Sequence, residues 1–384
     1  MVAKGDMVYA WSTDAEILKK GELGGAVTAL QKFALESKMV DAVLAVKKGY
    51  DIYDAKPVLI KDPAELADTA GSLHCGTLLV ASPIKKYLNG SKDMKIGVTV
   101  KGCDMMALLE LARRGSVNLD NITTIGLNCG GSVSPVTARK MIAEKFGVDP
   151  DDVRKEEIDK GQFIIEYGDE HKGIAMDELE DEGYGRRSNC RRCKYKVPRQ
   201  ADLACGNWGV IGPKAGKATF IEVCSDKGAD LLNKAVAAGV VQTEAPIPKG
   251  IEIRGKIENA MLKLGEKWRK NDFKALSEDL WGTIEKGTSR CIKCYSCIEN
   301  CPVCFTLADE LKGDSRMITS GAVPPNPMFH MRRFAHISDT CINCGQCEEL
   351  CPMDIPLALF SHAIRTESDT AFEPKLGEAL YNNK

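Results

Sequence analysis

The chain has 384 residues, enough for roughly two or three domains that fold without covalent staples. Its net charge is −2 and 28% of its residues are charged, so a broad basic surface for nucleic acid is not expected. No apolar run approaches the roughly 18 residues of a membrane span, and the N-terminus lacks a signal-peptide pattern, which predicts a cytoplasmic protein. The informative count is 16 cysteines, because clustered thiols in a reducing compartment indicate metal or redox chemistry.

Residues 1–245 alternate between short apolar strands and amphipathic helices. Strands are expected at Val43–Val46, Val58–Ile60, Ile96–Val100, Ile122–Leu127 and Phe220–Cys224, and helices at Gly25–Ser37, Asp104–Arg114, Ser134–Phe146 and Gly228–Ala238. Phe163–Tyr167 and Ile174–Met176 are expected to pair as a hairpin. This alternation predicts an α/β domain with a mostly parallel sheet.

Three further segments follow. Residues 246–288 are charged and have a helical period, which predicts one or two connecting helices. Residues 289–365 contain nine cysteines and form a separate predicted domain, in which Thr306–Lys312 is expected to be helical and Val323–Pro327 a rigid loop. Residues 366–384 are polar and are expected to be a frayed tail.

One cysteine motif occurs twice in residues 289–365. The first copy is Cys291-x2-Cys294-x2-Cys297-x3-Cys301-Pro302, and the second is Cys341-x2-Cys344-x2-Cys347-x3-Cys351-Pro352. This is the spacing of two-cluster ferredoxins, in which the fourth cysteine of each run ligates the other cluster. We therefore expect one [4Fe–4S] cluster on Cys291, Cys294, Cys297 and Cys351, and a second on Cys341, Cys344, Cys347 and Cys301. Zinc is the weaker alternative, because it would need pairs of C-x-x-C.

The spacer between the two motifs indicates the type of domain. Residues 302–340 form a longer connection than in compact bacterial ferredoxins. This length resembles the helical ferredoxin modules of multi-subunit reductases. We therefore expect a C-terminal helical dicluster ferredoxin-like domain, in which Cys304 is a packed thiol outside the ligand spacing.

Four cysteines in the first half form a second candidate site. Cys103 and Cys129 each follow a predicted strand, the place where α/β sheets carry ligands. Cys190 and Cys193 form a C-x-x-C pair flanked by cations, which favour thiolates. The spacing is consistent with a third [4Fe–4S] cluster, or with buried thiols plus a small structural or zinc loop. Cys205 is the first substitute if one of these four is not a ligand.

A glycine pair opens the first predicted helix. Gly24, Gly25, Ala26, Val27 and Thr28 are small residues at a helix N-terminus, where a phosphate group can approach the backbone. A plain turn explains the same pattern, and neither a G-x-G-x-x-G fingerprint nor a P-loop is present.

The chain resembles the beta subunits of coenzyme F420-reducing hydrogenases and F420-dependent formate dehydrogenases. The resemblance rests on Gly24–Leu30, Gly102-Cys103, Ile125–Gly131, Cys190-x2-Cys193 and Ala201–Leu203, and it covers about residues 5–245. The dicluster extension is typical of the formate dehydrogenase branch in methanogenic archaea. The resemblance implies FAD at Gly24–Thr28 and an N-terminal cluster on Cys103, Cys129, Cys190 and Cys193.

What the resemblance implies for function is an oxidoreductase subunit. Such a subunit takes electrons from formate oxidised on a molybdenum or tungsten catalytic (alpha) subunit and passes a hydride from FAD to coenzyme F420. Two alternatives stay open: a beta subunit of an F420-reducing hydrogenase or other F420-linked reductase, and a flavin-free iron–sulfur adaptor serving heterodisulfide reductase. Because F420 is anionic, Lys47, Lys48, Arg186, Arg187, Arg191 and Arg192 are candidates for its entrance.

Overall fold

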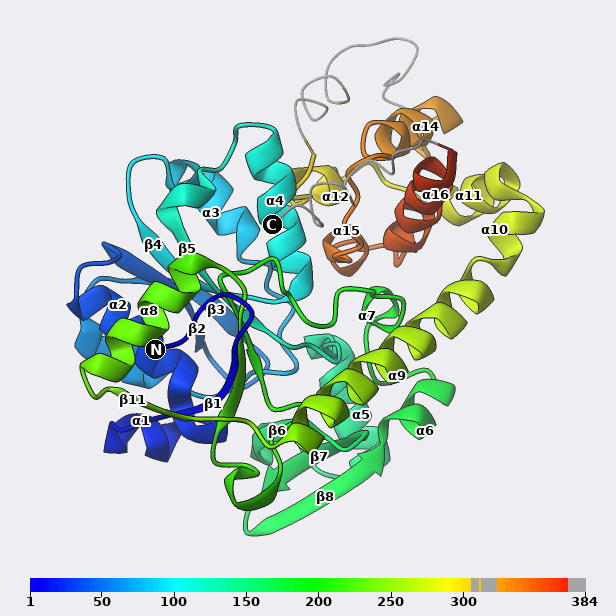
Figure 1. Ribbon diagram of the computed structural model, residues 1–384. Coiled ribbons are helices and arrows are strands. Elements are labelled where there is room, and N and C mark those ends of the chain that lie inside the picture. Colours follow the sequence, from blue (N-terminus) through cyan, green and yellow to red (C-terminus); the bar gives the residue numbers. More distant parts are fainter. Residues whose placement is uncertain (305–310, 312–322, 372–384) are drawn as a thin grey trace.

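The computed structural model describes residues 1–304, 311 and 323–371 (Figure 1). Apart from Leu311, the helix expected at Thr306–Lys312 lies outside the described residues, as does the tail after Ala371.

The strands are β1 (Met7–Ser12), β2 (Ala42–Lys48), β3 (Ala55–Ile60), β4 (Ile96–Val100), β5 (Ile122–Leu127), β6 (Val153–Asp159), β7 (Gln162–Tyr167), β8 (Glu170–Ala175), β9 (Leu203–Gly206), β10 (Thr219–Val223) and β11 (Val241–Glu244). The helices of the first part are α1 (Ala15–Lys20), α2 (Ala26–Glu36), α3 (Ala81–Tyr87), α4 (Gly102–Arg113), α5 (Pro135–Met141), α6 (Met176–Asp181), α7 (Ser188–Arg191) and α8 (Asp226–Ala237). The remaining helices are α9 (Pro248–Asp272), α10 (Lys274–Glu278), α11 (Leu280–Thr288), α12 (Ser296–Glu299), α14 (Pro327–Ala335), α15 (Gln346–Glu349) and α16 (Leu357–Ala371).

An eight-stranded sheet organises the first 245 residues, in the order β11-β1-β10-β9-β5-β4-β2-β3. The parallel pairs of this sheet are β2–β4, β4–β5 and β5–β9, which are formed by four contiguous strands. The pairs β2–β3, β9–β10, β10–β1 and β1–β11 are antiparallel, so the expectation of a mostly parallel sheet is wrong for the sheet as a whole. The mixed sheet still places the ends of β4 and β5 side by side, next to the start of α4.

Both faces of this sheet are covered by helices, as the alternation of apolar residues along each strand requires. Val43 and Ile125 face a core shared with α1, α2 and α8. Leu44 and Val98 face a second core, built with α3 and α4. The hairpin expected from the sequence is confirmed as β7–β8, and β6 joins it in a separate three-stranded sheet that packs on α5.

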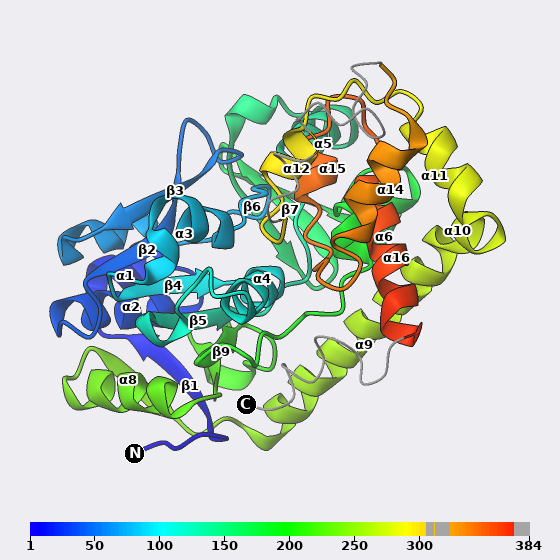
Figure 2. The same cartoon turned by 90° about the horizontal axis from the view of Figure 1, so that it is seen from above.

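The C-terminal unit packs on the second of these cores. Val303, Ile337 and Ile342 are buried in the same apolar cluster as Met105 and Leu108 of α4. Two views show α12 and α15 beside α4, with α14 and α16 on the outer side (Figures 1 and 2). Helix α16 continues to Ala371, past the boundary that the sequence placed at residue 365.

Helix α9 connects the two units and is the helix expected after residue 246. It runs diagonally from the sheet to the C-terminal helices (Figure 1). Near its start, the buried guanidinium of Arg254 donates from Nε to Glu222 Oε1 at 2.5 Å and from its other nitrogens to the carbonyls of Trp208 and Ala204. This ion pair fixes the helix to β9 and β10.

Further along, α9 contacts the loop that carries Cys193. The carbonyl oxygen of Cys193 lies 3.1 Å from the position that a Cβ on Gly265 would take, so a side chain there would press on the loop. The indole of Trp268 lies under the guanidinium of Arg191 at 4.3 Å, and Asp272 pairs with Arg192 at 2.7 Å. Residues three and four apart on one helix face therefore hold this loop in place.

No helix among the described residues is both long enough and apolar enough to cross a membrane.

The Arg254–Glu222 pair gives a stability prediction. Burial opposes ionisation of Glu222, but its bonds to Arg199 and Arg254 prevail and hold the pKa below the ordinary 4.5. Arg254→Met should destabilise the protein by roughly 2–4 kcal/mol at neutral pH, because a buried carboxylate loses one of its two partners. A depressed pKa contributes stability above 4.5 that is lost as the pH falls, so this penalty should shrink in acid.

The measurement is the thermal unfolding midpoint of the anaerobic protein by circular dichroism. Lys256→Met is the matched control, because Lys256 lies on the same helix in an exposed pair with Glu252 and should change stability by less than about 0.5 kcal/mol. Equal midpoints for the two variants would contradict a stabilising role for Arg254.

Candidate iron–sulfur sites and their surroundings

Four cysteines of the α/β domain meet at one end of the parallel strands. We call Cys103, Cys129, Cys190 and Cys193 the N-terminal quartet. Cys103 lies in the first turn of α4, after β4, and Cys129 follows β5, while Cys190 and Cys193 lie in and just after α7. Burial raises the pKa of the Cys103 thiol well above its ordinary value, and the neighbouring Cys193 and Cys129 raise it further. The four sulfurs are therefore close enough to interact electrostatically.

Two glycines make this convergence possible. A Cβ on Gly102 would lie 2.1 Å from the carbonyl oxygen of Tyr195, so the Cys193–Tyr195 segment can approach α4 only because that atom is missing. Gly131 has φ +130°, and a Cβ there would lie 3.2 Å from the Cβ of Cys190. A side chain at either position would therefore crowd the contact between the segments that carry the quartet.

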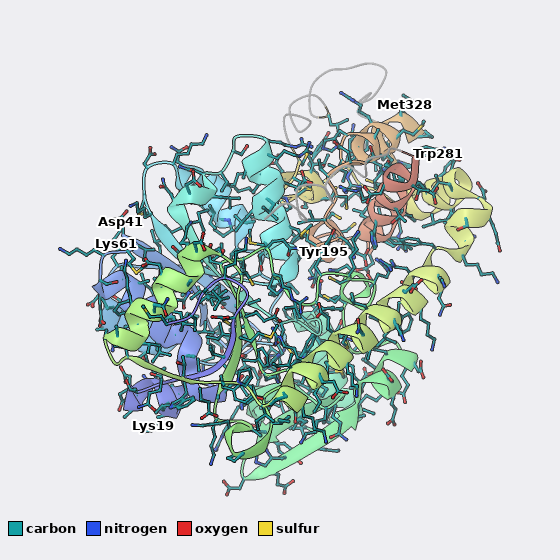
Figure 3. All side chains as sticks on the ribbon, viewed as in Figure 1. Lys19, Asp41, Lys61, Tyr195, Trp281 and Met328 are labelled. Atoms are coloured by element: carbon teal, nitrogen blue, oxygen red, sulfur yellow. The ribbon has the colours of Figure 1, made fainter. Side chains whose placement is uncertain are left out.

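Backbone and hydroxyl groups surround the quartet's sulfurs. The amide N–H of Tyr195 donates to Cys193 Sγ at 3.3 Å, and Ser132 Oγ lies 3.8 Å from Cys190 Sγ. Donors of this kind stabilise thiolate ligands and raise cluster potentials. Figure 3 places Tyr195 where the α/β domain meets the C-terminal helices.

Three cations offset the charge of the N-terminal quartet. Burial opposes ionisation of the Cys190 thiol, but Arg187, Ser132 and Lys196 outweigh it and lower its pKa. Lys196 is 2% exposed and donates to the carbonyl of Cys190 at 3.2 Å. Lys101 pairs with Asp104 at 2.8 Å, and the charges of Cys103 and Cys129 contribute to its raised pKa. This arrangement suits a buried group that carries negative charge.

Cys75, Cys205 and Cys224 lie elsewhere. Cys205 is fully buried on β9 in the core of α2 and α8, and its electrostatic neighbours are Arg254, Cys224 and Glu222. The structure therefore does not place Cys205 with the quartet as a substitute ligand.

The repeated motif of the C-terminal unit has a repeated backbone. Lys293 and Tyr295 have positive φ, and so do Asn343 and Gly345 at the equivalent positions of the second copy. Each loop leads into a one-turn helix, α12 and α15, and these two helices pack together. The sequence repeat is thus a structural repeat, as expected for a loop that wraps a cluster.

The expected exchange of the fourth cysteine would form two sets of four thiols. We call Cys291, Cys294, Cys297 and Cys351 the distal quartet, and Cys301, Cys341, Cys344 and Cys347 the proximal quartet. Burial raises the pKa of Cys344 to about 12, with Cys301 and Cys341 adding to it. Burial also raises the pKa of Cys291, and there the contributing thiols are Cys297 and Cys351. Cys294 is exposed.

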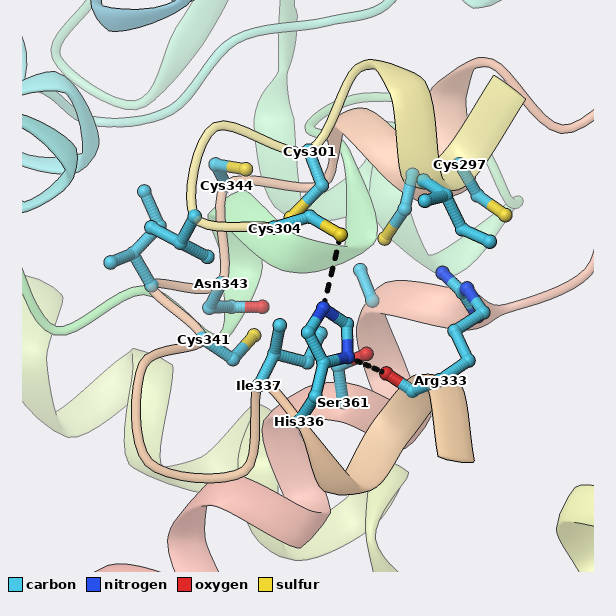
Figure 4. A pocket seen from close by; sticks show the side chains of 16 residues that line it. Cys297, Cys301, Cys304, Arg333, His336, Ile337, Cys341, Asn343, Cys344 and Ser361 are labelled. Atoms are coloured by element: carbon cyan, nitrogen blue, oxygen red, sulfur yellow. Dashed lines mark hydrogen bonds between the residues drawn. The ribbon is translucent and has the colours of Figure 1, made fainter. Parts of the chain in front are cut away.

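A pocket in the C-terminal unit brings together cysteines of both quartets (Figure 4). Its lining includes Cys297 of the distal quartet, all four cysteines of the proximal quartet, and Arg333. Cys304 also faces it, with Sγ 3.0 Å from His336 Nε2, and Cys301 and Cys297 are among its electrostatic neighbours. Among the described residues no three metal-binding side chains converge on a site for a single ion. The fit to a larger group is instead indicated by orphaned N–H groups of Arg187 and Arg333, which have no partner in the described part.

The proximal quartet contacts the N-terminal quartet through reciprocal bonds. Asn189 Nδ2 donates to the carbonyl of Asn343 at 3.2 Å, and Asn343 Nδ2 donates to the carbonyl of Asn189 at 3.0 Å. Arg187 Nε donates to Glu349 Oε2 at 2.9 Å, across the same contact. No pattern in the sequence indicated these pairs, because their members are about 150 residues apart.

The glycine pair at α2 is explained by packing. Gly24 and Gly25 have positive φ, and a Cβ on each would meet Lys217 O at 2.4 Å and Ile17 Cγ2 at 2.6 Å. The space that these glycines leave on that side is filled by the chain itself. Ala26 and Thr28 are buried in the first turn of α2. Assignment of FAD to Gly24–Thr28 therefore continues to rest on the family resemblance.

A buried carboxyl that sequence reasoning missed lies near this helix. Glu156 Oε1 accepts the backbone N–H groups of His74 at 2.9 Å and Cys75 at 3.3 Å. Burial raises the pKa of Glu156 to about 7, with Glu22, two residues before Gly24, adding to the shift. Glu156 is therefore a group that can hold or release a proton near neutral pH.

The arginines suggested for the F420 entrance make contacts with other residues of the chain. Arg186 is buried and makes two bonds to Glu180, Arg192 is buried against Asp272, and Arg191 stacks on Trp268. Lys47 is half exposed and lies 3.6 Å from Asp68. The idea of an arginine-lined entrance is therefore not supported by their positions.

Family models and known proteins were compared with the chain. Residues 7–85 and 93–249 match the models described as coenzyme F420 hydrogenase/dehydrogenase beta subunit N-term and C terminus, and residues 287–355 match a 4Fe-4S dicluster domain. The chain is 50% identical over 364 residues to "F420-dependent formate dehydrogenase subunit beta" of Methanocaldococcus jannaschii, covering 93% of each protein. It is also 50% identical over 376 residues to "F420-dependent formate dehydrogenase 1 subunit beta" of Methanococcus maripaludis, covering 96% of this chain and 95% of that one.

More distant similarities cover the α/β part. "Coenzyme F420 hydrogenase subunit beta" of Methanococcus voltae is 30% identical over 241 residues, which is 62% of this chain and 83% of that protein. A chain of the F420-reducing [NiFe] hydrogenase complex from Methanosarcina barkeri superposes with a TM-score of 0.60 at 22% identity, over 69% of this chain and 91% of that one. The second similarity supports the fold.

The N-terminal quartet predicts an iron count. The anaerobically reconstituted chain should contain about twelve iron and twelve sulfide, and Cys190→Ser should lower both to about eight. Cys224→Ser is the matched control, because Cys224 is outside all three quartets and should keep the full count. A wild-type count near eight, or no loss in Cys190→Ser, would contradict a third cluster.

Proposed function

We propose that this chain, which belongs to the coenzyme F420 hydrogenase/dehydrogenase beta-subunit family, is the cytoplasmic electron-transfer subunit of an F420-dependent formate dehydrogenase. It reduces F420 with electrons from formate that is oxidised on a molybdenum or tungsten catalytic subunit. The observation that carries this proposal is the similarity over almost the whole chain to two such beta subunits, dicluster unit included.

The three quartets are the proposed cluster ligands. Clusters transfer single electrons, whereas F420 accepts a hydride, and FAD supplies the conversion between the two when it is bound. Family membership supports FAD at the first turn of α2. The chain's own contribution is to hold these groups in sequence, to keep water away from them, and to set their potentials through charge and hydrogen bonds.

The exposure of the quartets supports a direction. Cys294 of the distal quartet is exposed, and Ile292 beside it is 46% exposed. Trp281 and Met328 also lie on the outer side of the C-terminal helices (Figure 3). The proximal quartet is enclosed against α4, next to the N-terminal quartet. We infer that the catalytic subunit docks at the distal quartet and that F420 is reduced in the α/β domain.

Reduction of F420 takes up protons as well as electrons. The carboxyl of Glu156 is the proposed proton-holding group, because its pKa of about 7 keeps it partly protonated at neutral pH and the charge of Glu22, two residues before Gly24, acts on it. This role of Glu156 is part of the same proposal, and it depends on the assignment of FAD to the start of α2.

The proposal predicts a split between two activities. With the catalytic subunit present, formate should reduce both F420 and an artificial dye. Cys190→Ser should abolish F420 reduction and retain dye reduction, because the distal and proximal quartets are intact. Cys224→Ser should retain both, as measured from F420 absorbance and dye colour under anaerobic conditions. Loss of both activities in Cys190→Ser, with the complex still assembled, would contradict this order.

Flavin removal separates the alternatives. After FAD is stripped, formate should still bleach the cluster absorbance, while F420 reduction should stop and return when FAD is added. A chain that binds no FAD and reduces only heterodisulfide reductase would be the flavin-free adaptor. A complex that reduces F420 with hydrogen but not with formate would be the hydrogenase-type or another F420-linked reductase.

A further inference from the structure

Two buried arginines occupy corresponding places, one at each contact between quartets. Arg333 of α14 is 2% exposed and lines the pocket between the distal and proximal quartets, beside Cys297 (Figure 4). The side chain of Arg187 is 9% exposed, at the contact between the proximal and N-terminal quartets. Its Nη2 lies 2.7 Å from the position that a Cβ on Gly345 would take, in the loop between Cys344 and Cys347.

Both guanidinium groups keep nitrogens without a protein acceptor. Among the described residues, Nε and Nη1 of Arg333 and Nη2 of Arg187 are buried with no hydrogen-bond partner. A buried cationic N–H with no acceptor is costly, so an acceptor outside the chain is expected there. Thiolate and sulfide sulfur in the adjacent quartets are such acceptors.

The electrostatic neighbours of each arginine come from two quartets. Arg333 lines the pocket together with Cys297 of the distal quartet and Cys347 of the proximal quartet. The carbonyl of Arg187 accepts the backbone N–H of Cys190 of the N-terminal quartet at 2.9 Å, while its guanidinium faces the loop between Cys344 and Cys347 of the proximal quartet. Each cation thus lies within the field of two ligand sets rather than one.

We propose that Arg333 and Arg187 are positioning residues that each stabilise the reduced form of two neighbouring clusters and so raise the reduction potentials on both sides of each contact. The inference rests on the proposed function for its assignment of clusters to the quartets. Reduction adds one negative charge to a cluster, and a cation shared by two clusters favours that added charge on either side.

The test is an EPR-monitored redox titration of the anaerobically reconstituted full chain, with signals assigned through Cys291→Ser, Cys341→Ser and Cys190→Ser. Arg333→Met should lower the potentials of the distal and proximal clusters and leave the N-terminal cluster unchanged. Arg187→Met should lower those of the proximal and N-terminal clusters and leave the distal one unchanged. Arg332→Met, at an exposed position next in the same helix, should shift none.

Three further variants, Arg333→Lys, Arg187→Lys and Glu349→Gln, separate charge from packing. Arg→Lys at either position keeps the charge and should recover most of the shift. Glu349→Gln removes the carboxylate that partly neutralises Arg187, so it should raise the same two potentials that Arg187→Met lowers. If a methionine variant loads less iron, the glutamine variants Arg333→Gln and Arg187→Gln provide the same neutral comparison.

The outcomes distinguish this inference from the proposed function. Unshifted potentials, a shift confined to one cluster, or equal shifts for lysine and methionine would overturn the role of the arginines, while three cluster signals and F420 reduction in the wild type would leave the function intact. A wild type with fewer than three cluster signals, or with no F420 reduction, would instead contradict the proposed function.

Discussion

The cluster ligands proposed above are buried sulfur atoms, which place several negative charges where water cannot screen them, and such charge persists only when cations or hydrogen-bond donors are held close by. In this protein those cations come from separate segments: Lys101 precedes α4, Lys196 follows Cys193, and Arg333 lies in α14. Arg187 belongs to the α/β domain yet faces Cys344 of the C-terminal unit. The contact between the α/β domain and the C-terminal unit therefore both packs the two units together and supplies cations that offset the charge of the sulfur ligands.

Helix α9 holds this surface from the other side. Arg254 fixes its first turns to the sheet through Glu222, while Gly265 and Trp268 further along pack against the loop of Cys190 and Cys193. The same helix then leads through α10 and α11 to the distal quartet. A rigid element of 25 residues thus connects the sheet, the N-terminal quartet and the C-terminal unit, which limits relative movement of groups that must stay within electron-transfer distance.

The parts that could be predicted from the sequence are those that local spacing determines. Metal ligation requires a loop of defined length, so the repeat around Cys291 and Cys341 was readable and reappears as matching backbone. Pairings between distant segments were not readable. β1 pairs antiparallel with β10 and β11, more than 200 residues away. Likewise, Asn189 and Asn343 look like ordinary polar residues until the fold brings them together. The sequence also suggested the arginines near Cys190 as candidates for the F420 entrance, whereas the fold buries Arg186 against Glu180 and Arg192 against Asp272.

The three quartets differ in solvent exposure, so the series has one open end and one enclosed end. Cys294 is open to solvent and Cys291 is half-buried, whereas the sulfurs of the proximal and N-terminal quartets are enclosed between α4, α7 and the C-terminal helices. The proposed docking of a partner protein at the distal end is consistent with this difference in exposure. Enclosure also strengthens each charge interaction, so the arginines deeper in the molecule influence neighbouring potentials more than the same residues would at the surface. A series with one accessible end and strong internal coupling favours electron transfer between a docked donor and an acceptor in the α/β domain. It disfavours loss of electrons to other acceptors in solution.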